Sequence, residues 1–154
     1  MKMFNRAKVS QQRFLLLNKA ELKNITKKND WKFKWTGEFK LPERDIYKLA
    51  IVNNLNIIQG FISLVVKADH VYMHLIESAA FNIGRSKTYY GVPGNLVDFA
   101  CRLSFQRGGE GYVSFISKTK LIDHYIESLG AVHFGGHLMV ITTEVALKLI
   151  NKYF

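Results

Sequence analysis

Residues 71–109 read VYMHLIESAAFNIGRSKTYYGVPGNLVDFACRLSFQRGG, and this stretch decides the fold class. Its first part, Val71 to Ser78, is rich in β-branched and apolar residues, which predicts a strand. Its last part has apolar residues at helical spacing, namely Leu96, Phe99, Ala100 and Leu103. A polar, glycine-containing loop joins the two. A strand that leads through such a loop into a helix gathers unpaired backbone N–H groups at the helix start, where they bind phosphate.

Strands are predicted on both sides of this unit. Ile46–Val52 and Ile57–Lys67 precede it, and Ala68-Asp69-His70 is the expected hairpin turn into the strand at Val71. After it the sequence predicts a strand at 111–116, a helix at 121–129 capped by Gly130, a hairpin at 131–141 turning at Gly135-Gly136, and a last helix from its cap Thr143 to Lys152. The expected fold is α+β: a mixed, mostly antiparallel central sheet flanked by helices, built on a strand–pyrophosphate loop–helix core.

The N-terminal third has a different composition. Residues 6–25 are predicted to form an amphipathic helix, and Trp31-Lys32-Phe33-Lys34-Trp35 alternates aromatic residues with lysine, as in a half-buried strand. Residues 1–48 hold 13 of the 22 Lys and Arg and five of the 12 Asp and Glu, so +8 of the net +10 lies there. Such a basic surface attracts polyanions or serves as a solvated surface.

The length of 154 residues fits one domain, which we divide into a basic segment at 1–45, a core at 46–141 and a C-terminal helix at 142–154. With 48% hydrophobic and 22% charged residues the chain is neither disordered nor a coiled coil. The longest apolar stretch, Leu55–Val66, is too short to span a bilayer, and no signal peptide is visible, so a cytoplasmic protein is expected. The lone Cys101 is expected to be a core residue, and no metal is expected.

The core resembles the GNAT superfamily of N-acetyltransferases over roughly residues 46–141. That family places a hairpin before a pyrophosphate loop of pattern Gln/Arg-x-x-Gly-x-Gly/Ala. Thr88-Tyr89-Tyr90-Gly91-Val92-Pro93 aligns with the loop: Gly91 matches the central glycine, Thr88 replaces Gln/Arg, and Pro93 replaces the second Gly/Ala. Residues 121–131 (LIDHYIESLGA) resemble the later helix A-x-x-x-Tyr-x-x-x-x-Gly-Phe.

The resemblance implies that acetyl-CoA is the acyl donor and a primary amine the acceptor, with direct attack of the amine on the thioester. The implied cofactor-binding residues are Arg85, Lys87, Thr88, Tyr90, Gly91, Val92, Pro93, Gly94 and Asn95. Arg102 on the following helix is a further candidate cation. The acceptor itself stays open.

Two residues are expected to be catalytic by the same resemblance. Tyr125 falls where family members protonate the leaving thiolate, and Glu77 lies near the strand end where a carboxylate acts as base. His74 is a weaker candidate base, because three residues separate it from Glu77 and a regular strand places the two on opposite faces.

A second interpretation remains open. The replacements at Thr88 and Pro93 also fit a catalytically degenerate binding protein with the same fold. Its basic N-terminal third would contact RNA or an acidic protein, with the aromatic residues of 31–35 as stacking groups. Nucleic acid is possible but not favoured, no membrane partner is expected, and the chain is expected to be a monomer or a homodimer.

Overall fold

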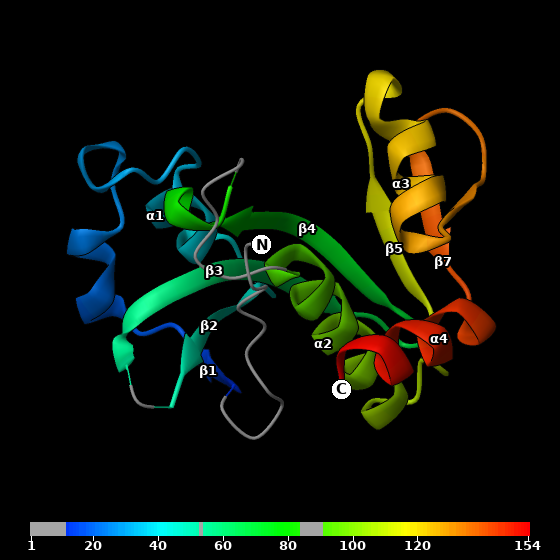
Figure 1. Cartoon of the computed structure of the whole chain (residues 1–154), viewed down its shortest axis with the longest axis horizontal. Coiled ribbons are helices and arrows are strands. Elements are labelled where there is room, and N and C mark those ends of the chain that lie inside the picture. Colours follow the sequence, from blue (N-terminus) through cyan, green and yellow to red (C-terminus); the bar gives the residue numbers. More distant parts are fainter. Residues whose placement is uncertain (1–11, 53, 84–90) are drawn as a thin grey trace, which may run out of the picture. The chain divides into compact units, whose positions relative to one another are not determined.

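The computed structural model describes residues 12–52, 54–83 and 91–154 (Figure 1). The strands are β1 (Gln12–Leu16), β2 (Asp45–Ile51), β3 (Asn54–Val66), β4 (Val71–Ser78), β5 (Val113–Ile116), β6 (Val132–His133) and β7 (Leu138–Ile141). The α-helices are α1 (Trp35–Lys40), α2 (Val92–Gln106), α3 (Ile122–Leu129) and α4 (Thr143–Tyr153). Short 3-10 helices are η2 (Lys19–Asn24), η3 (Lys27–Asn29), η4 (Ala80–Asn82) and η5 (Thr119–Leu121).

Within the described residues, seven strands form one sheet in the order β1-β2-β3-β4-β5-β7-β6. β1 pairs antiparallel with β2, and β7 pairs antiparallel with both β5 and β6. β4 and β5 run parallel, with Val71 opposite Val113 and Tyr72 opposite Ser114. Parallel neighbours need a crossover connection, and α2 supplies it. The predicted α+β class with a mostly antiparallel sheet is therefore confirmed.

The chain forms two compact units. The first comprises residues up to Ser63 together with Leu75–Leu96. Its core contains two tryptophans and six other buried residues: Leu17, Leu22, Ile25, Trp31, Trp35, Ile46, Phe61 and Ala79. Phe61 lies at the centre of the aromatic contacts, since its ring is 4.6 Å from that of Trp31 and 5.1 Å from that of Trp35.

The second unit comprises Leu64–His74 and Val97–Phe154. Its interior is built by the inward residues of β5 and β7, where Val113 pairs with Ile141 and Phe115 with Met139. All four are at most 4% exposed. Gly111, at a φ of 83°, lies so close to Phe105 and Ala146 that a Cβ there would be 2.6 Å and 3.0 Å from them. Helix α4 therefore packs against the end of α2 at a position where only glycine fits.

Several predicted elements are confirmed. β4 has the bounds expected from the sequence, and Lys67 N–H donates to the His70 carbonyl to close the β3–β4 hairpin at 2.8 Å. Gly130 caps α3 in the left-handed conformation at φ 73°. Gly135 and Gly136 both have positive φ, and Phe134 N–H bonds the Leu138 carbonyl across their turn.

The predicted helix at 6–25 is wrong over its described part. Residues 12–16 form β1 instead, paired with β2 so that Phe14 lies opposite Leu49. Asn18 then starts η2 through a capping box: its side chain accepts the Glu21 N–H while the Glu21 carboxylate accepts the Asn18 N–H. Pairing with a distant strand has overridden the local apolar stripe.

The predicted strand at 31–35 is also wrong. Trp31 and Trp35 are buried, but residues 31–34 are irregular and α1 begins at Trp35. Phe33 is 44% exposed, so the three aromatic residues do not share one environment. The backbone N–H groups of Lys32 and Phe33 bond a side chain rather than a neighbouring strand.

The N-cap of the last helix, α4, also differs from the prediction by one residue. The last helix forms as predicted, but its N-cap is Thr142, and the Thr143 hydroxyl donates to the Glu110 carbonyl at 2.6 Å. Among the described residues, no helix is both long enough and apolar enough to cross a membrane.

Candidate functional site

The first turn of α2 overlaps the end of the pyrophosphate loop that the sequence predicts at 88–93. Gly91 precedes the helix with a φ of 77°, a left-handed conformation that side chains disfavour. The Asn95 backbone N–H and the Asn95 side-chain amide both donate to the Gly91 carbonyl at 2.9 Å. Pro93 has no N–H, so the backbone donors that remain for an anion in this turn are those of Gly91, Val92 and Gly94.

Only part of the predicted cofactor loop can be placed. Arg85, Lys87, Thr88 and Tyr90 lie outside the described residues. Val92, Gly94 and Asn95 are buried, and Pro93 is exposed. Asn95 Oδ1 is buried and accepts no hydrogen bond from the described part of the chain. A buried acceptor of this kind is suited to a ligand hydroxyl or N–H.

Gly60 explains how closely this turn packs on the sheet. A Cβ on Gly60 would lie 3.0 Å from the Glu77 carbonyl oxygen, 3.0 Å from Leu96 and 3.2 Å from Val92. The glycine in β3 therefore lets the start of α2 approach the end of β4. Sequence analysis did not single out Gly60, although a glycine inside a strand is a known sign of close backbone approach.

Glu77 is buried on β4, and its carboxylate accepts three hydrogen bonds. Lys32 N–H donates to Oε2 at 2.7 Å, Phe33 N–H donates to Oε1 at 3.2 Å, and the indole Nε1 of Trp35 donates to Oε1 at 2.8 Å. Its assignment as a catalytic base stays a prediction. The three contacts add a second role, because they fix the backbone of residues 31–35.

His74 and Glu77 face opposite sides of β4, as the spacing predicted. Val71, Met73 and Glu77 are buried on one side, whereas His74 is exposed. The His74 ring lies 6.0 Å from that of Tyr72. The strand is regular here, so it does not bring His74 and Glu77 together.

Tyr125 is half-buried on α3, in the second unit. Its ring meets Phe115 of β5 edge to face, with centroids 5.2 Å apart. Its neighbour His124 is exposed. Two other histidines of this unit bond backbone carbonyls: His133 bonds that of Gly136, and His137 bonds that of Ser117, both at 2.9 Å.

Asp98 and Arg102 form an ion pair on α2 at 3.2 Å, and Asp98 is only 1% exposed. Burial raises the pKa of Asp98 to about 6, although the Arg102 guanidinium opposes the shift. Arg102 also stacks over the Phe154 ring at 4.3 Å. Arg102 is thus engaged in contacts within its own unit.

Cys101 lies in the core, as predicted. Its side chain is fully buried. Burial and the neighbouring Asp98 charge raise the pKa of the thiol to about 12. A thiol that stays protonated at neutral pH is a poor nucleophile.

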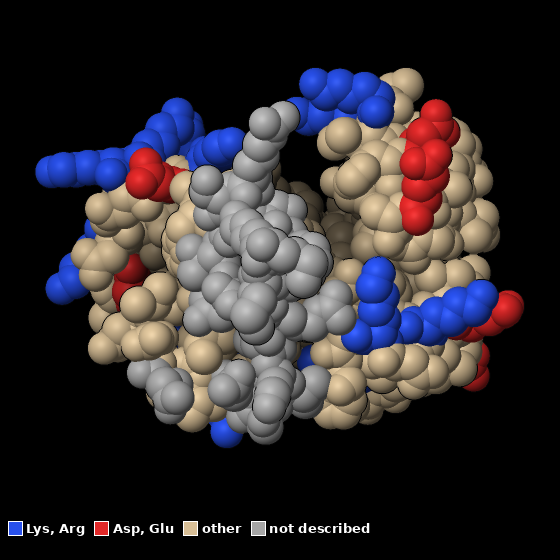
Figure 2. Space-filling view, viewed as in Figure 1, with Lys and Arg blue, Asp and Glu red and all other residues tan. Residues whose placement is uncertain are grey.

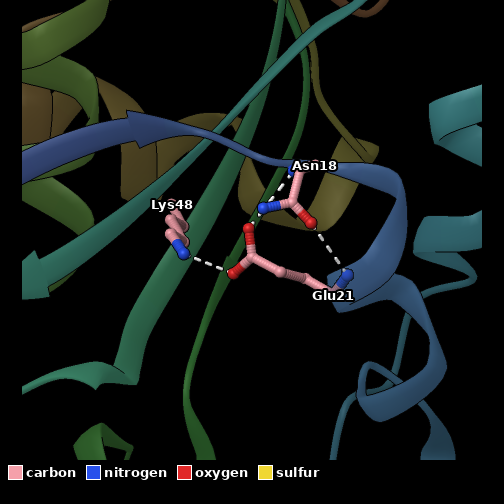
Figure 3. A network of polar contacts seen from close by, with 3 residues as sticks. All are labelled: Asn18, Glu21 and Lys48. Atoms are coloured by element: carbon pink, nitrogen blue, oxygen red, sulfur yellow. Dashed lines mark hydrogen bonds and ion pairs between the residues drawn. The ribbon is translucent and has the colours of Figure 1, made fainter.

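A groove of about 640 Å³ opens in the first unit between η2, η3, η4 and the first half of β3. Its apolar walls include Trp31, Leu55, Ile57 and Phe81. Glu21 and Lys48 form an ion pair at its edge, and Figure 3 shows how Asn18 holds the same carboxylate from the other side. The lining also includes the polar residues Asn24, Asn29, Asp30 and Asn56, so the groove offers both apolar and polar contacts.

Solved structures share this architecture. The spermidine/spermine N-acetyltransferase SpeG from Vibrio cholerae, solved in mutant forms, matches with a TM-score of 0.63 at 14% identity, over 90% of this chain and 98% of the other. AtaTR bound with acetyl-CoA matches with a TM-score of 0.59 at 12% identity, over 92% and 99%. A complex of KacTA with DNA matches with a TM-score of 0.58 at 11% identity, over 92% and 99%.

The chain has the GNAT fold. No protein-family model matches it, and no curated protein matches it by sequence. The GNAT resemblance that the sequence suggested for residues 46–141 is thus confirmed at the level of the fold, over 90% of the chain or more. In this GNAT fold, the predicted pyrophosphate loop precedes α2 and the predicted acid Tyr125 lies on α3.

Proposed function

We propose that the protein is a single-domain N-acetyltransferase that moves an acetyl group from acetyl-CoA to a primary amine. The observation that carries the proposal is the start of α2, where Gly91 adopts φ 77° and Gly60 admits the helix against the end of β4. This is the glycine-dependent strand–loop–helix geometry that an anion-binding turn requires. The GNAT fold of solved structures that hold acetyl-CoA supports the same donor.

The chain's own residues supply the donor site. The proposed donors to the pyrophosphate are the backbone N–H groups of Gly91, Val92 and Gly94, and Arg85 and Lys87 are the proposed countercharges. Pro93 shapes the first turn without contributing a donor. Asn95 closes the turn through its bonds to the Gly91 carbonyl and offers its free Oδ1 to the ligand.

The proposed reaction is direct transfer. The neutral amine attacks the thioester carbonyl, an N–C bond forms, the C–S bond breaks, and the amine gives up one proton to water, from which the Tyr125 hydroxyl is restored. In this proposal the Tyr125 hydroxyl donates a proton to the departing sulfur. Glu77, which the resemblance suggests as the base, already accepts three hydrogen bonds: from Phe33 and Trp35 at Oε1 and from Lys32 at Oε2.

The surface near the N-terminus favours an acceptor that carries negative charge. The seven lysines of residues 19–40 are all exposed. Their acidic neighbours are partly neutralised internally, since Glu21 pairs with Lys48 and Glu38 pairs with Arg44. Figure 2 shows Lys and Arg projecting over this part of the surface. The same charges would repel a polyamine such as spermidine.

The first experiment is calorimetric titration with acetyl-CoA, followed by a screen of primary amines for CoA release. We expect saturable one-site binding, and a rise of several degrees in Tm at about 100 times the Kd. Gly91→Glu should abolish binding through steric and charge clash at the pyrophosphate. Absence of binding at millimolar acetyl-CoA would refute the proposed donor.

The exposed lysines also support a second candidate, a GNAT-fold protein that has lost catalysis and binds RNA or an acidic protein. AtaT bound to the C-terminus of its antitoxin AtaR is a precedent for a protein partner in this fold. RNA affinity should fall steeply with salt because counterions are released, whereas acetyl-CoA affinity should change less. Titration of both ligands at two salt concentrations therefore separates the two functions.

A further inference from the structure

The Glu77 carboxylate joins β4 to a stretch of chain that has no regular structure. Lys32 and Phe33 donate backbone N–H groups to it, and Trp35 donates its indole N–H. Glu77 is 6% exposed and Trp35 is fully buried. Since a buried acceptor without donors is costly, the carboxylate and the 31–35 segment depend on each other for their positions.

Two aromatic anchors hold the same segment on one face of the sheet. The rings of Trp31 and Trp35 both pack on Phe61 of β3. The preceding residue, Gly60, faces Val92 and Leu96 at the start of α2. Because consecutive strand residues point to opposite faces, the 31–35 segment lies on the face opposite the proposed pyrophosphate turn.

In this position the 31–35 segment contributes residues to the groove wall and to the exposed surface. Trp31 forms part of the wall of the 640 Å³ groove. Phe33 is 44% exposed between the exposed Lys32 and Lys34. The two lysines attract an acceptor that carries negative charge, and the Phe33 ring between them offers it an apolar contact on a backbone that is held in place.

We propose that Glu77 is a positioning residue for the acceptor rather than the proton-accepting base. Its carboxylate fixes the Lys32–Phe33 backbone, and through Trp31 it fixes one wall of the groove. The proposal rests on the acetyltransferase function proposed above. It predicts that the loss of Glu77 changes the KM for the amine. Another group, or water, then accepts the proton of the amine.

Hydrogen exchange tests the positioning without any acceptor. In Glu77→Gln and Glu77→Ala, we expect the Lys32 and Phe33 amides to exchange at least about tenfold faster than in the parent chain, with the β2 amides unchanged. Glu38→Gln is the matched control, because Glu38 is an equally buried glutamate of the same unit that bonds Ser63 and Arg44. Unchanged exchange at Lys32 and Phe33 in both Glu77 variants would overturn the proposal.

Kinetics then separates positioning from proton transfer. The probe amines are spermidine and an acidic peptide with a free N-terminal amine, and CoA release is followed from pH 5 to pH 9. Positioning predicts a KM for the peptide raised about tenfold or more in Glu77→Gln, with the acidic limb of the kcat profile retained. Loss of that limb with an unchanged KM would establish Glu77 as the base and overturn the proposal.

Acetyl-CoA titration of the same variants keeps this proposal distinct from the proposed function. Among the described residues, the Glu77 side chain bonds the 31–35 segment and not the start of α2, so acetyl-CoA affinity should change less than threefold. If the parent chain binds no acetyl-CoA, the proposed function fails while the exchange arm still decides the role of Glu77. If neither probe amine is acetylated, the exchange arm again decides.

Discussion

Trp35 donates its indole N–H to Glu77 at 2.8 Å in the buried interior of the first unit, although 42 residues separate the two in the sequence. The bond joins the first turn of α1 to the end of β4. It is charge-assisted, because the acceptor is a carboxylate, and such bonds contribute more than neutral ones. This contact makes the fold of the N-terminal third depend on β4, a strand that comes much later in the sequence.

Trp35→Phe tests the strength of that contact. The variant keeps an aromatic ring against Phe61 but removes the donor, which leaves Glu77 Oε1 with the Phe33 N–H alone. We expect the free energy of unfolding to fall by about 1–3 kcal/mol from the lost bond, with a further loss from the smaller ring. Urea denaturation of the variant and the parent chain measures this change in the free energy of unfolding.

Trp31→Phe is the control for ring size. Trp31 also packs on Phe61, yet its indole makes no hydrogen bond to Glu77 among the described contacts. Equal losses of stability in the two variants would show that the indole–carboxylate bond contributes little.

Asp98 makes stability depend on pH. Burial raises its pKa to about 6 in the folded state, above the ordinary value of 3.8 for an aspartate. Ionisation therefore opposes folding: the stabilisation from the protonated form is complete below about pH 3.8 and is lost as the pH rises through about 6. A difference of about two pKa units corresponds to about 3 kcal/mol.

Asp98→Asn should abolish this dependence. We expect the variant to be more stable than the parent at pH 7.5 and to show a flatter unfolding free energy between pH 4.5 and pH 7.5. The loss of the ion pair with Arg102 reduces the gain. Glu144→Gln, at an exposed carboxylate on α4, should leave the pH dependence intact. A parent chain whose stability is constant across this range would contradict the prediction.

The central part of the fold was predictable because its signals are local. Strand β4, helix α2, helix α3 with its Gly130 cap and the Gly135-Gly136 hairpin follow from periodicity and turn residues within a few positions. The order of these elements was sufficient to suggest the GNAT fold. The predicted burial of Cys101 followed from the usual role of a lone helical cysteine as a small core residue.

Residues 12–16 and 31–35 were mispredicted because their conformation is fixed from a distance. Phe14 pairs with Leu49 of β2, and Lys32 bonds Glu77 of β4. No pattern within the segment itself reveals either partner. Likewise, sequence reasoning identified Glu77 as chemically notable but could not show that its acceptor sites are used by the 31–35 segment.

Gly91→Ala tests the left-handed turn at the start of α2 with a minimal change. A side chain at φ 77° is strained, and the altered turn would misdirect the N–H groups proposed for the pyrophosphate. We expect stability to fall by about 1 kcal/mol and acetyl-CoA affinity to fall at least about tenfold. Calorimetry and urea denaturation measure the two effects separately.

Gly108→Ala provides the control, because Gly108 has a φ of 86° and open space around its Cα. It carries a comparable backbone strain at the far end of α2. Acetyl-CoA affinity should be unaffected there. A similar loss of affinity in both variants would mean that the effect comes from general destabilisation and not from the loop.

Tyr125→Phe tests the proposed acid. Phenylalanine keeps the edge-to-face contact with Phe115, so the fold and acetyl-CoA affinity should be retained. Loss of a general acid reduces turnover by about 10²–10⁴-fold, and we expect kcat to fall within that range while KM for the amine stays within threefold. Tyr112→Phe, at an exposed tyrosine of the same unit, should keep parent activity. The proposed acid acts only when the thiolate departs. A more acidic thiol leaves more readily without a proton, so the loss of turnover should be smaller when the donor is a thioester of such a thiol. Full turnover of Tyr125→Phe with acetyl-CoA would assign the proton to water instead.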